Sequence, residues 1–436
     1  MSEVAIIGGG VIGCAVAWEL ARRGARPVVI DRLGDVGHGS TSASCGIVRR
    51  FYSTPTMTAM AEEGARIWAD WGNHLGLGGP GKEPMLARFE RPGMLFIPPA
   101  VDERIEGIVE HMRAIGVRVE LLGADEIAAR FPFLDTSSHW PIRQPDDEDF
   151  FEETERRICG AVFEPDAGYV VSPMLATQNL REVGERDGVR FLLGHAVEEV
   201  RRHEKGRRFE LVFSDGSRRS FDVLLNASGP HSSVFNRKVG CELPIETRAL
   251  RREVCAVETP TGSDGRPLGV PVVGDLDSGI YLRPEGGGRD LVVGSLDPEC
   301  DTMEWIDDPD DWQMGVSEKI FERQILRLMK RMPTVEKGRL RGIAGLYDVT
   351  PLDWNPVLDR TQVPGYYVAI GTSGSSFKTA PVVGALVAQL IEACEGGRNH
   401  DADPVRATLP RTNFEVDLSF FSRLRGAHTS SGTVLG

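Results

Sequence analysis

A glycine-rich stretch, Gly8 to Gly13, has the spacing that brings a backbone against a pyrophosphate. Gly8 is expected to make the tight turn, Gly10 to admit the phosphates, and Gly13 to let the next helix pack closely on the strand. Asp31 follows about twenty residues later, where a carboxylate accepts hydrogen bonds from ribose hydroxyls and repels a 2′-phosphate. These residue types at this spacing predict a dinucleotide-binding site.

The segments around these residues are predicted to form the β-α-β unit that such a site needs. Val4 to Ile7 is a continuous apolar run, as in a buried parallel strand, and Pro27 to Ile30 is a second one. Cys14 to Arg23 has the pattern of a helix between them, ended by Gly24. The partly positive N-terminus of this helix would face the phosphates. A glycine triplet also occurs in ordinary loops, so this context is what favours the dinucleotide site.

Length and composition indicate a globular protein of two or three domains, with 436 residues, 41% of them hydrophobic and 26% charged. The formal net charge of −14 argues against nucleic acid or an anionic membrane as the main partner. Because no apolar run reaches about eighteen residues and the chain enters a core strand at once, we expect no membrane span and no cleavable signal, and therefore a cytoplasmic protein. The 7 cysteines and 9 histidines are scattered, which predicts reduced thiols and no metal site.

The order of strand and helix patterns predicts two interleaved domains. Dinucleotide-binding elements are expected at 1–84, 165–238 and 340–400, a second domain at 85–164 and 239–339, and a C-terminal tail at 401–436. The second domain contains alternating segments typical of an antiparallel sheet.

Several local features accompany this division. Glycine and proline density indicates a linker at 76–84, and residues 308–332 are expected to be mostly helical. A loop at 371–376 should lead into a helix that ends near Cys394. The strongly acidic segment 144–155 is interpreted as a solvated loop or helix start, with a partner-binding surface as the alternative.

Six segments, taken together and in this order, resemble the D-amino-acid oxidase superfamily of flavoproteins, and most closely its branch of sarcosine oxidases and sarcosine/dimethylglycine dehydrogenases. They are the N-terminal stretch through Asp31, Gly39 to Gly46, Asn226 to Pro230, Gly279 to Glu285, Gly345 to Pro351, and Gly371 to Lys378. The resemblance implies FAD as the cofactor. It also implies an α/β, Rossmann-like FAD-binding domain on a mostly parallel sheet, with an inserted α+β substrate domain on a mainly antiparallel sheet.

The resemblance places FAD against residues from several parts of the chain. They are Gly8, Gly10, Val11, Ile12, Gly13, Asp31, Arg32, Ser40, Thr41, Ser42, Gly46, Ile47, Val197, Gly229, Gly345, Gly371, Gly374, Ser375, Ser376, Phe377 and Lys378. The turn and helix start after Gly371 could stabilise negative charge on a reduced flavin, although a plain strand-to-helix turn is an equal interpretation of that loop.

The mode of FAD attachment is also implied by the resemblance. Gly345 and Ala43 stand where relatives carry the cysteine and the histidine that bind flavin covalently. Neither residue can form such a bond, so non-covalent FAD is expected.

Arg49 and Lys378 match an arginine and a lysine that bind the substrate carboxylate in monomeric sarcosine oxidase. A guanidinium fork and a point charge together can orient a carboxylate, although Arg49 and Arg50 could also be surface or phosphate-contacting cations. Gly46 replaces a second family arginine, so this carboxylate clamp is either incomplete or supplemented from elsewhere. Tyr347 replaces the arginine of D-amino-acid and glycine oxidases, which argues against those activities.

Further residues are expected to border the substrate pocket or to influence its chemistry. Tyr281, His231 and Arg283 are the candidates, with packing or capping roles as the alternative for each. Val292 matches the lysine that activates dioxygen in monomeric sarcosine oxidase, which favours a dehydrogenase over an oxidase unless another cation takes its place.

These observations predict an enzyme that oxidises the C–N bond of a small, carboxylate-bearing, sarcosine-like secondary or N-methylated amine by hydride transfer to flavin N5. The electron acceptor would be oxygen or a redox partner, and the enzyme could form homo- or hetero-oligomers. One alternative is an FAD-dependent 2-hydroxy-acid dehydrogenase, which needs a base such as His231. The other is a flavin-containing subunit or assembly protein without turnover of its own.

Overall fold

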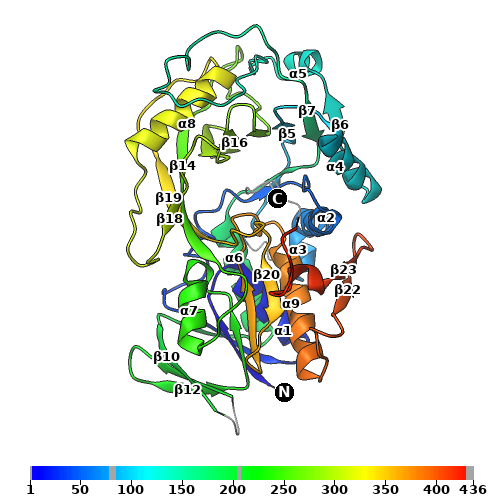
Figure 1. The fold of residues 1–436 in the computed structure, drawn as a ribbon, viewed down its shortest axis with the longest axis vertical. Helices are drawn as coiled ribbons and strands as arrows, with labels where there is room; N and C mark the ends of the chain where they lie inside the picture. The colour runs from blue at the N-terminus through cyan, green and yellow to red at the C-terminus, as the bar shows by residue number, and fades with distance from the viewer. Residues whose placement is uncertain (1, 78–84, 204–207, 429–436) are drawn as a thin grey trace.

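The computed structural model describes residues 2–77, 85–203 and 208–428, so all but the first two residues of the predicted linker at 76–84 lie outside this part. The chain forms two units stacked along the long axis of the molecule (Figure 1). The lower unit contains the N-terminus and a mostly parallel sheet, and the upper unit contains a mainly antiparallel sheet. This is the predicted fold class.

The lower unit is built on a six-stranded sheet. In spatial order its strands are β20 (Val357–Arg360), β21 (Tyr366–Ile370), β13 (Val223–Asn226), β1 (Glu3–Ile7), β2 (Arg26–Asp31) and β9 (Arg190–Leu193). Neighbours run parallel except β20 and β21, which are antiparallel. The predicted β-α-β unit is present at its centre.

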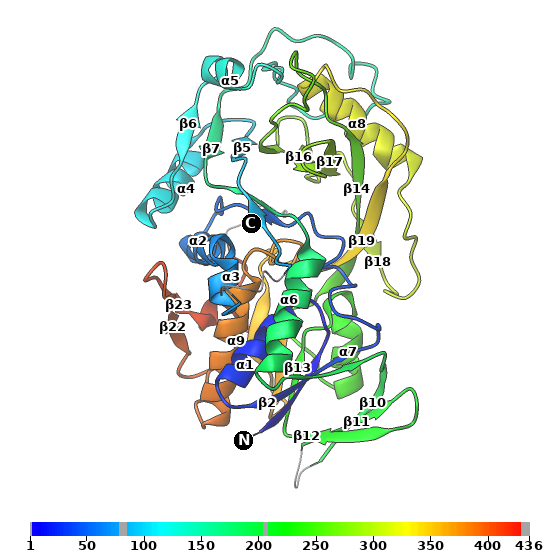
Figure 2. The same cartoon turned by 180° about the vertical axis from the view of Figure 1, so that it is seen from behind.

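Both faces of this sheet are buried, which explains the continuous apolar runs. Val4 and Ile6 of β1 belong to one hydrophobic core, and the alternate residues Ala5 and Ile7 belong to another. Helices α1 (Val11–Arg22), α6 (Pro173–Arg186) and α9 (Ala380–Glu395) pack on the first face. Figure 2 shows α6 beside α1 from behind.

The second face is covered by another small sheet and a helix. They are β10 (Val197–Arg202), β11 (Phe209–Phe213), β12 (Arg218–Phe221) and α7 (Ser232–Val239). The sheet includes the hairpin predicted around Asp215-Gly216.

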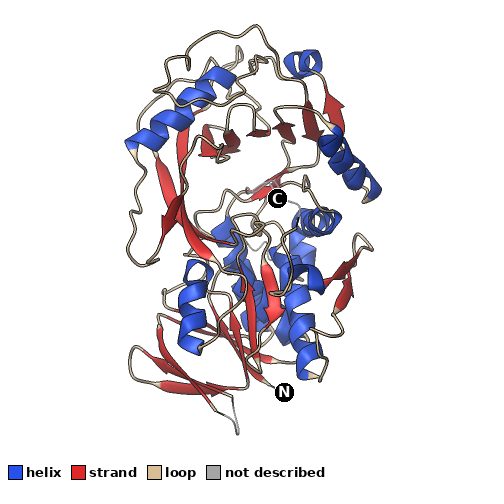
Figure 3. Cartoon of the chain, in the orientation of Figure 1, coloured by secondary structure: helices blue, strands red, loops and turns tan. Residues whose placement is uncertain are grey.

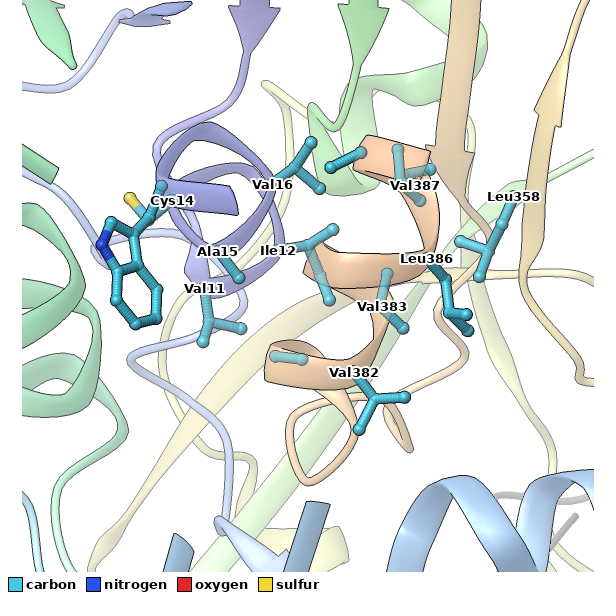
Figure 4. Close-up of a cluster of buried hydrophobic side chains, with 14 of the residues drawn as sticks. Val11, Ile12, Cys14, Ala15, Val16, Leu358, Val382, Val383, Leu386 and Val387 are labelled. Carbon is cyan, nitrogen blue, oxygen red and sulfur yellow. The ribbon is translucent and has the colours of Figure 1, made fainter. Parts of the chain in front are cut away.

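Close packing of α1 on α9 sets the position of the glycine turn. Figure 4 shows Ile12 and Val16 of α1 directed at Val383 and Val387 of α9. A Cβ built at Gly384 would lie 2.9 Å from the Cβ of Ala15, so only glycine lets the two helices approach this closely. Helix α1 begins at Val11, three residues earlier than the sequence pattern indicated.

The upper unit is built on a nine-stranded sheet. Its strands are β18 (Glu304–Ile306), β14 (Arg248–Glu258), β17 (Asp290–Ser295), β16 (Ile280–Glu285), β15 (Val272–Asp275), β5 (Met94–Ile97), β7 (Ala161–Glu164) and β6 (Glu120–Leu122), with β19 (Gly342–Val349) also paired to β14. Only β5 and β15 pair in parallel. Figure 3 shows the helices of this unit at its periphery; they are α4 (Glu103–Ala114), α5 (Ala124–Arg130) and α8 (Glu318–Arg331).

The expectation of a mostly helical segment at 308–332 is only half correct. Ser317 caps α8 by accepting a hydrogen bond from the backbone N–H of Ile320, so the helix starts at Glu318. Residues 308–317 form an irregular loop, because their aspartates and glycine favour turns over helix.

Two connections join the units. A small sheet of β3 (Ile47–Val48), β8 (Gly168–Val170) and β4 (Phe89–Glu90) lies between them, beside α2 (Pro55–Ala69) and α3 (Trp71–His74). Strands β14 and β19 run from the upper unit down to the lower one. Strand β19 thus pairs in the upper sheet, although it follows residue 340, where the sequence pattern placed the return to the dinucleotide-binding domain.

Residues 401–428, the part of the predicted C-terminal tail that the structure describes, pack against the lower unit. It contains β22 (Arg406–Thr408), β23 (Glu415–Asp417) and the 3-10 turn Leu418–Phe421. Leu418 and Phe421 are fully buried in the same core as α1 and α9. Within the described residues, no helix has both the length and the apolar character needed to cross a bilayer.

Candidate active site

The glycine turn between β1 and α1 is shaped by two close approaches. Gly8 has φ +115°, and a Cβ there would lie 2.1 Å from the carbonyl oxygen of Ala227. A Cβ at Gly13 would lie 1.9 Å from the carbonyl oxygen of Gly8, so Gly13 allows helix and strand to pack. A Cβ at Gly10, by contrast, meets only the Thr41 hydroxyl, at 3.3 Å. The turn therefore packs tightly against the protein at Gly8 and Gly13, and there is free space beside Gly10.

Asp31 lies at the end of β2 and faces this turn. One carboxylate oxygen accepts a hydrogen bond from the backbone N–H of Gly9 (2.6 Å), and the other accepts one from Leu33 (2.8 Å). The hydroxyl of Thr41 accepts a hydrogen bond from the N–H of Val11 (3.2 Å). Asp31 thus supports the turn and also borders the space in front of it.

A solvent-connected cavity of about 790 Å³ lies in front of the turn. Predicted FAD-binding residues that line it are Gly8, Gly10, Val11, Ile12, Asp31, Ser40, Thr41, Gly229, Gly374, Ser376 and Phe377. Segments distant in sequence therefore meet at one elongated site, which suits a dinucleotide.

Six predicted FAD-binding residues are not among those lining a cavity here, namely Gly13, Arg32, Ser42, Val197, Gly345 and Gly371. The Arg32 side chain forms an ion pair with Asp310, and the Ser42 hydroxyl donates to the carbonyl oxygen of Gly39. Val197 starts β10, in the sheet that covers the opposite face. Gly371 acts through its backbone N–H, which donates to Asp348 (2.6 Å).

A second cavity, of about 820 Å³, lies between the two units. It shares Ser44, Tyr347, Gly374 and Phe377 with the first, so the two cavities adjoin. It is also lined by six residues expected from the sequence to lie near the flavin or the substrate, namely Gly46, Ile47, Arg49, Ser375, Lys378 and Tyr281.

Arg49 and Lys378 come together in this second cavity. Both side chains are buried, with 4% exposure each, and both pack on the ring of Tyr52, at 4.2 Å for the guanidinium and 5.4 Å for the ammonium. The Lys378 ammonium donates to the Tyr52 hydroxyl (2.9 Å) and to the carbonyl oxygen of Ser375 (2.6 Å). The result is a fixed pair of cations at one end of the cavity.

Burial and charge shift the pKa values of this group. Burial lowers the pKa of Lys378, and the nearby Arg49 charge lowers it further, against the opposing effect of Tyr52. Burial raises the pKa of Tyr52, but the charges of Lys378 and Arg49 outweigh it and leave that pKa below its ordinary value. The cluster therefore favours negative charge close to it.

Arg50 has a different role from Arg49. Its guanidinium binds Glu62 (3.0 Å) and lies 3.8 Å from Glu164, and all three side chains are buried. Arg50 does not line either cavity. It is a structural cation that neutralises two buried carboxylates.

His231 and Tyr281 are separated by the fold. Tyr281 lines the cavity between the units, with its hydroxyl 3.4 Å from the Cys45 sulfur. His231 lies in the 3-10 turn Gly229–His231 of the lower unit, where its Nε2 is 3.0 Å from Asp310 and it lines neither cavity. The structure thus places His231 away from Arg49 and Lys378, because the turn after β13 directs it to the surface loop at 308–310. Arg283 also points elsewhere, toward Tyr169 and Glu285.

Sequence reasoning missed several residues of the cavity. Met94, Leu250, Leu296 and Trp354 form apolar parts of its wall, and Arg252 is a third buried cation there. Arg252 forms an ion pair with Asp297 and donates to the carbonyl oxygen of Ser295 (2.7 Å). Its pKa is lowered by burial. Adjacent arginines at 251 and 252 in an alternating strand were the available signal, since one of the two must face inward.

Asp348 was also missed, and it lines the dinucleotide cavity. Burial raises the pKa of its carboxyl to about 7, although the N–H of Gly371 and the hydroxyls of Ser232 and Thr247 partly counter this. Helix α9 starts at Ala380, later than expected, so the turn at 371–379 rather than a helix N-terminus faces the cavities. Asp348 holds that turn through Gly371.

Comparisons with known proteins agree with this geometry. The family model "DAO: FAD dependent oxidoreductase" matches residues 3–390. The chain is 26% identical over 419 residues to FAD-dependent oxidoreductase domain-containing protein 1 of Xenopus laevis, covering 89% of this chain and 79% of that protein. It is 24% identical to monomeric sarcosine oxidase of Bacillus sp. (strain B-0618), covering 92% of this chain and 94% of the relative.

Two solved structures share the whole architecture. L-proline dehydrogenase from P. horikoshii superposes with a TM-score of 0.72 at 20% identity, covering 97% of this chain and 96% of that chain. Glycine oxidase from Geobacillus kaustophilus superposes with a TM-score of 0.71 at 21% identity, covering 98% and 100%. With the glycine turn, the paired cavities and the family match over most of its length, the chain belongs to the DAO family of FAD-dependent oxidoreductases.

Proposed function

We propose that this protein oxidises the C–N bond of a small amino acid whose amine is secondary or N-methylated. The observation that carries the proposal is the composition of the cavity between the units. Among the described residues that line it, Arg49, Lys378 and Arg252 are charged, and no aspartate, glutamate or histidine is present. Such a cavity can hold a carboxylate but offers no carboxylate or imidazole base.

Arg49 and Lys378 would bind the substrate carboxylate. Both are buried, and their charges are held in place by Tyr52 and by backbone oxygens of Phe51 and Ser375. In a site shielded from water, charge-assisted hydrogen bonds to a carboxylate are strong and directional. The carboxylate end of the substrate would therefore be fixed first.

The same charges would prepare the amine for oxidation. Positive charges nearby disfavour an ammonium group and lower its pKa, so the bound amine loses its proton more easily than in water. A neutral amine has the lone pair that expels hydride from the adjacent carbon. The carbon then becomes an imine, which water hydrolyses, and no protein base has to act in the oxidation itself.

FAD would occupy the two adjoining cavities. The turn at Gly8 and Gly10, together with Asp31, would hold the adenine nucleotide part of FAD. The residues that both cavities share would hold its flavin ring. When bound, FAD supplies the acceptor for the hydride and its two electrons. We propose non-covalent binding, because a Cβ at Gly345 would lie 2.5 Å from the Cβ of Ala43, and neither residue has a group that could join flavin.

The 2-hydroxy-acid alternative has less support. An alcohol needs a base to take its proton as hydride leaves. His231 lies outside the cavity lining and contacts Asp310. Burial raises the pKa values of the phenols of Tyr281 and Tyr347 above their ordinary range, which makes them poor bases at neutral pH.

We propose a dehydrogenase in preference to an oxidase, with a redox partner as electron acceptor. Val292 brings no charge to the position where an oxygen-activating lysine is expected. Arg252 is a buried cation in the cavity wall, but its ion pair with Asp297 neutralises it. Slow reoxidation of reduced enzyme by air is the expected behaviour.

Anaerobic mixing of the FAD-loaded protein with substrates tests the proposal. Sarcosine, N-methylalanine, glycine, glycolate and lactate are added separately, and loss of oxidised flavin absorbance is followed before and after air is admitted. The proposal expects reduction by at least one of the secondary amines and none by the hydroxy acids. Reduction by hydroxy acids alone would support the alternative activity, and no reduction by any of them would support a subunit without turnover.

A further inference from the structure

The roof of the substrate cavity is largely apolar. The upper unit contributes Met94 from β5, Leu250 and Arg252 from β14, Tyr281 from β16, and Leu296 just after β17. These side chains come from the upper unit, whereas Lys378 comes from the lower unit, so they offer mostly apolar surface to the part of a substrate that Arg49 and Lys378 do not bind.

Each apolar roof residue belongs to a packed cluster that restricts movement of its side chain. Leu250 packs with Val349 and Trp354, which also line the cavity. Leu296 belongs to a separate cluster that contacts the ring of Tyr281. The walls are therefore rigid. A ligand without an apolar group leaves this wall in contact with water and loses the favourable free energy of burying it.

Arg252 is the one charged side chain of this roof, and its charge is already balanced. Its guanidinium pairs with Asp297 and donates to the carbonyl oxygen of Ser295, and the Arg252 and Asp297 side chains are 14% and 10% exposed. A balanced, buried ion pair exerts little attraction on a further carboxylate. The roof thus favours an apolar group over a second acidic one.

We propose that the natural substrate is a monocarboxylic secondary amino acid that carries an apolar group larger than methyl on its nitrogen or α-carbon, and that the Arg252–Asp297 pair excludes dicarboxylic amines. This inference rests on the proposed function and specifies the substrate class of that same site. A substrate of this kind has its carboxylate at Arg49 and Lys378 and its apolar group against Leu250, Leu296 and Met94.

Anaerobic reduction kinetics with four probes test this class. Sarcosine, N-propylglycine, N-methylleucine and iminodiacetate differ in apolar size and in the number of carboxylates. We expect kcat/KM for N-propylglycine or N-methylleucine to exceed that for sarcosine by on the order of tenfold or more, since each methylene in an apolar pocket contributes at least about that factor. Iminodiacetate should be the poorest substrate of the four.

Asp297→Asn tests the role of the ion pair. Asp297 has φ +54°, a conformation that asparagine tolerates well, so the backbone should be retained. Removal of its charge leaves Arg252 unbalanced, and the kcat/KM ratio of iminodiacetate to sarcosine should rise by on the order of tenfold. The matched control is Asp290→Asn at the start of β17, which breaks a surface pair with Arg341 and should leave the ratio unchanged.

The outcomes separate this inference from the function on which it rests. If sarcosine reduces the flavin and neither larger probe exceeds it, or if the wild type prefers iminodiacetate, the substrate class is wrong while amine oxidation stands. An unchanged ratio in a folded, FAD-containing Asp297→Asn protein would overturn the role of the pair. If the variant does not fold, the wild-type series alone decides the class. If no amine reduces the flavin, the proposed function fails as well.

Discussion

At the scale of single residues, the site depends on two buried cations with different neighbours. Arg49 and Lys378 share the ring of Tyr52 and face the cavity, while Arg50, next in sequence, is neutralised by Glu62 and Glu164. The resemblance favoured Arg49 as the carboxylate ligand, but residue type alone does not separate it from Arg50, because both are cations in the same short stretch. Only the direction in which each side chain leaves the backbone separates a ligand-facing arginine from a structural one.

Arg49→Ala should raise KM for sarcosine by about 30- to 700-fold, which corresponds to about 2 to 4 kcal/mol for a lost buried charge contact. FAD should stay bound, because Arg49 does not line the nucleotide cavity. Steady-state kinetics and the flavin spectrum of the purified variant measure both effects. Arg50→Lys is the control, since it keeps a charge toward Glu62 and Glu164 and should change KM little. An unchanged KM in Arg49→Ala removes Arg49 from the site.

Asp348 should make stability depend on pH. Its pKa is raised to about 7 in the folded protein, so the unfolded chain releases this proton at lower pH than the folded one. The free energy of unfolding therefore decreases as pH rises from about 4 to 7, by at most about 1.4 kcal/mol per pH unit. The loss is complete above pH 7.

Asp348→Asn removes this penalty and keeps an oxygen that can accept from Gly371. The Tm of the variant minus that of the wild type should therefore be more positive at pH 8 than at pH 5. Thermal unfolding of both FAD-loaded proteins at the two pH values measures the difference. The same gap at both pH values would show that the Asp348 carboxyl ionises normally in the fold.

At the scale of elements, the glycine turn works because two helices fit against the sheet beneath it. The β-α-β unit could be predicted from sequence because its apolar runs, glycines and helix end are all local signals. The start of α9 and the irregular loop at 308–317 were not predicted. Ser317 and the aspartates of that loop are local signals for a later helix start, whereas the start of α9 has no side-chain cap to mark it. Helix α9 does not follow the turn at 371–376 directly but begins at Ala380.

Gly384→Ala should disturb the contact between α1 and α9. The new Cβ would lie 2.9 Å from the Cβ of Ala15, and overpacking of this kind costs about 1–3 kcal/mol of stability. Because α1 carries the glycine turn, FAD affinity should fall with it. Gly107→Ala in α4 is the matched control, since a Cβ there meets nothing within 4 Å and alanine favours a helix by about 1 kcal/mol. Equal Tm values for Gly384→Ala and wild type would show that the helices adjust freely.

At the scale of the whole molecule, the substrate cavity exists only where the two units meet. Arg49 and Lys378 belong to the lower part, and Leu250, Arg252 and Tyr281 come from the upper sheet. Sequence reasoning named the first two and Tyr281 through resemblance, but it missed Arg252 and the apolar roof. Their role depends on strand register: β14 pairs with β17 and β19, and its alternate residues face either the cavity or the helix α8.

The central claim is that this cavity binds an amino acid by its carboxylate and favours its neutral amine. The limiting rate of anaerobic flavin reduction by sarcosine, measured from pH 6 to pH 10 by stopped flow, tests it most directly. The limiting rate should rise with pH and level off at a pKa below that of the free amine, because the buried charges of Arg49 and Lys378 disfavour the ammonium form. Reduction by glycolate with none by sarcosine at any pH would contradict it.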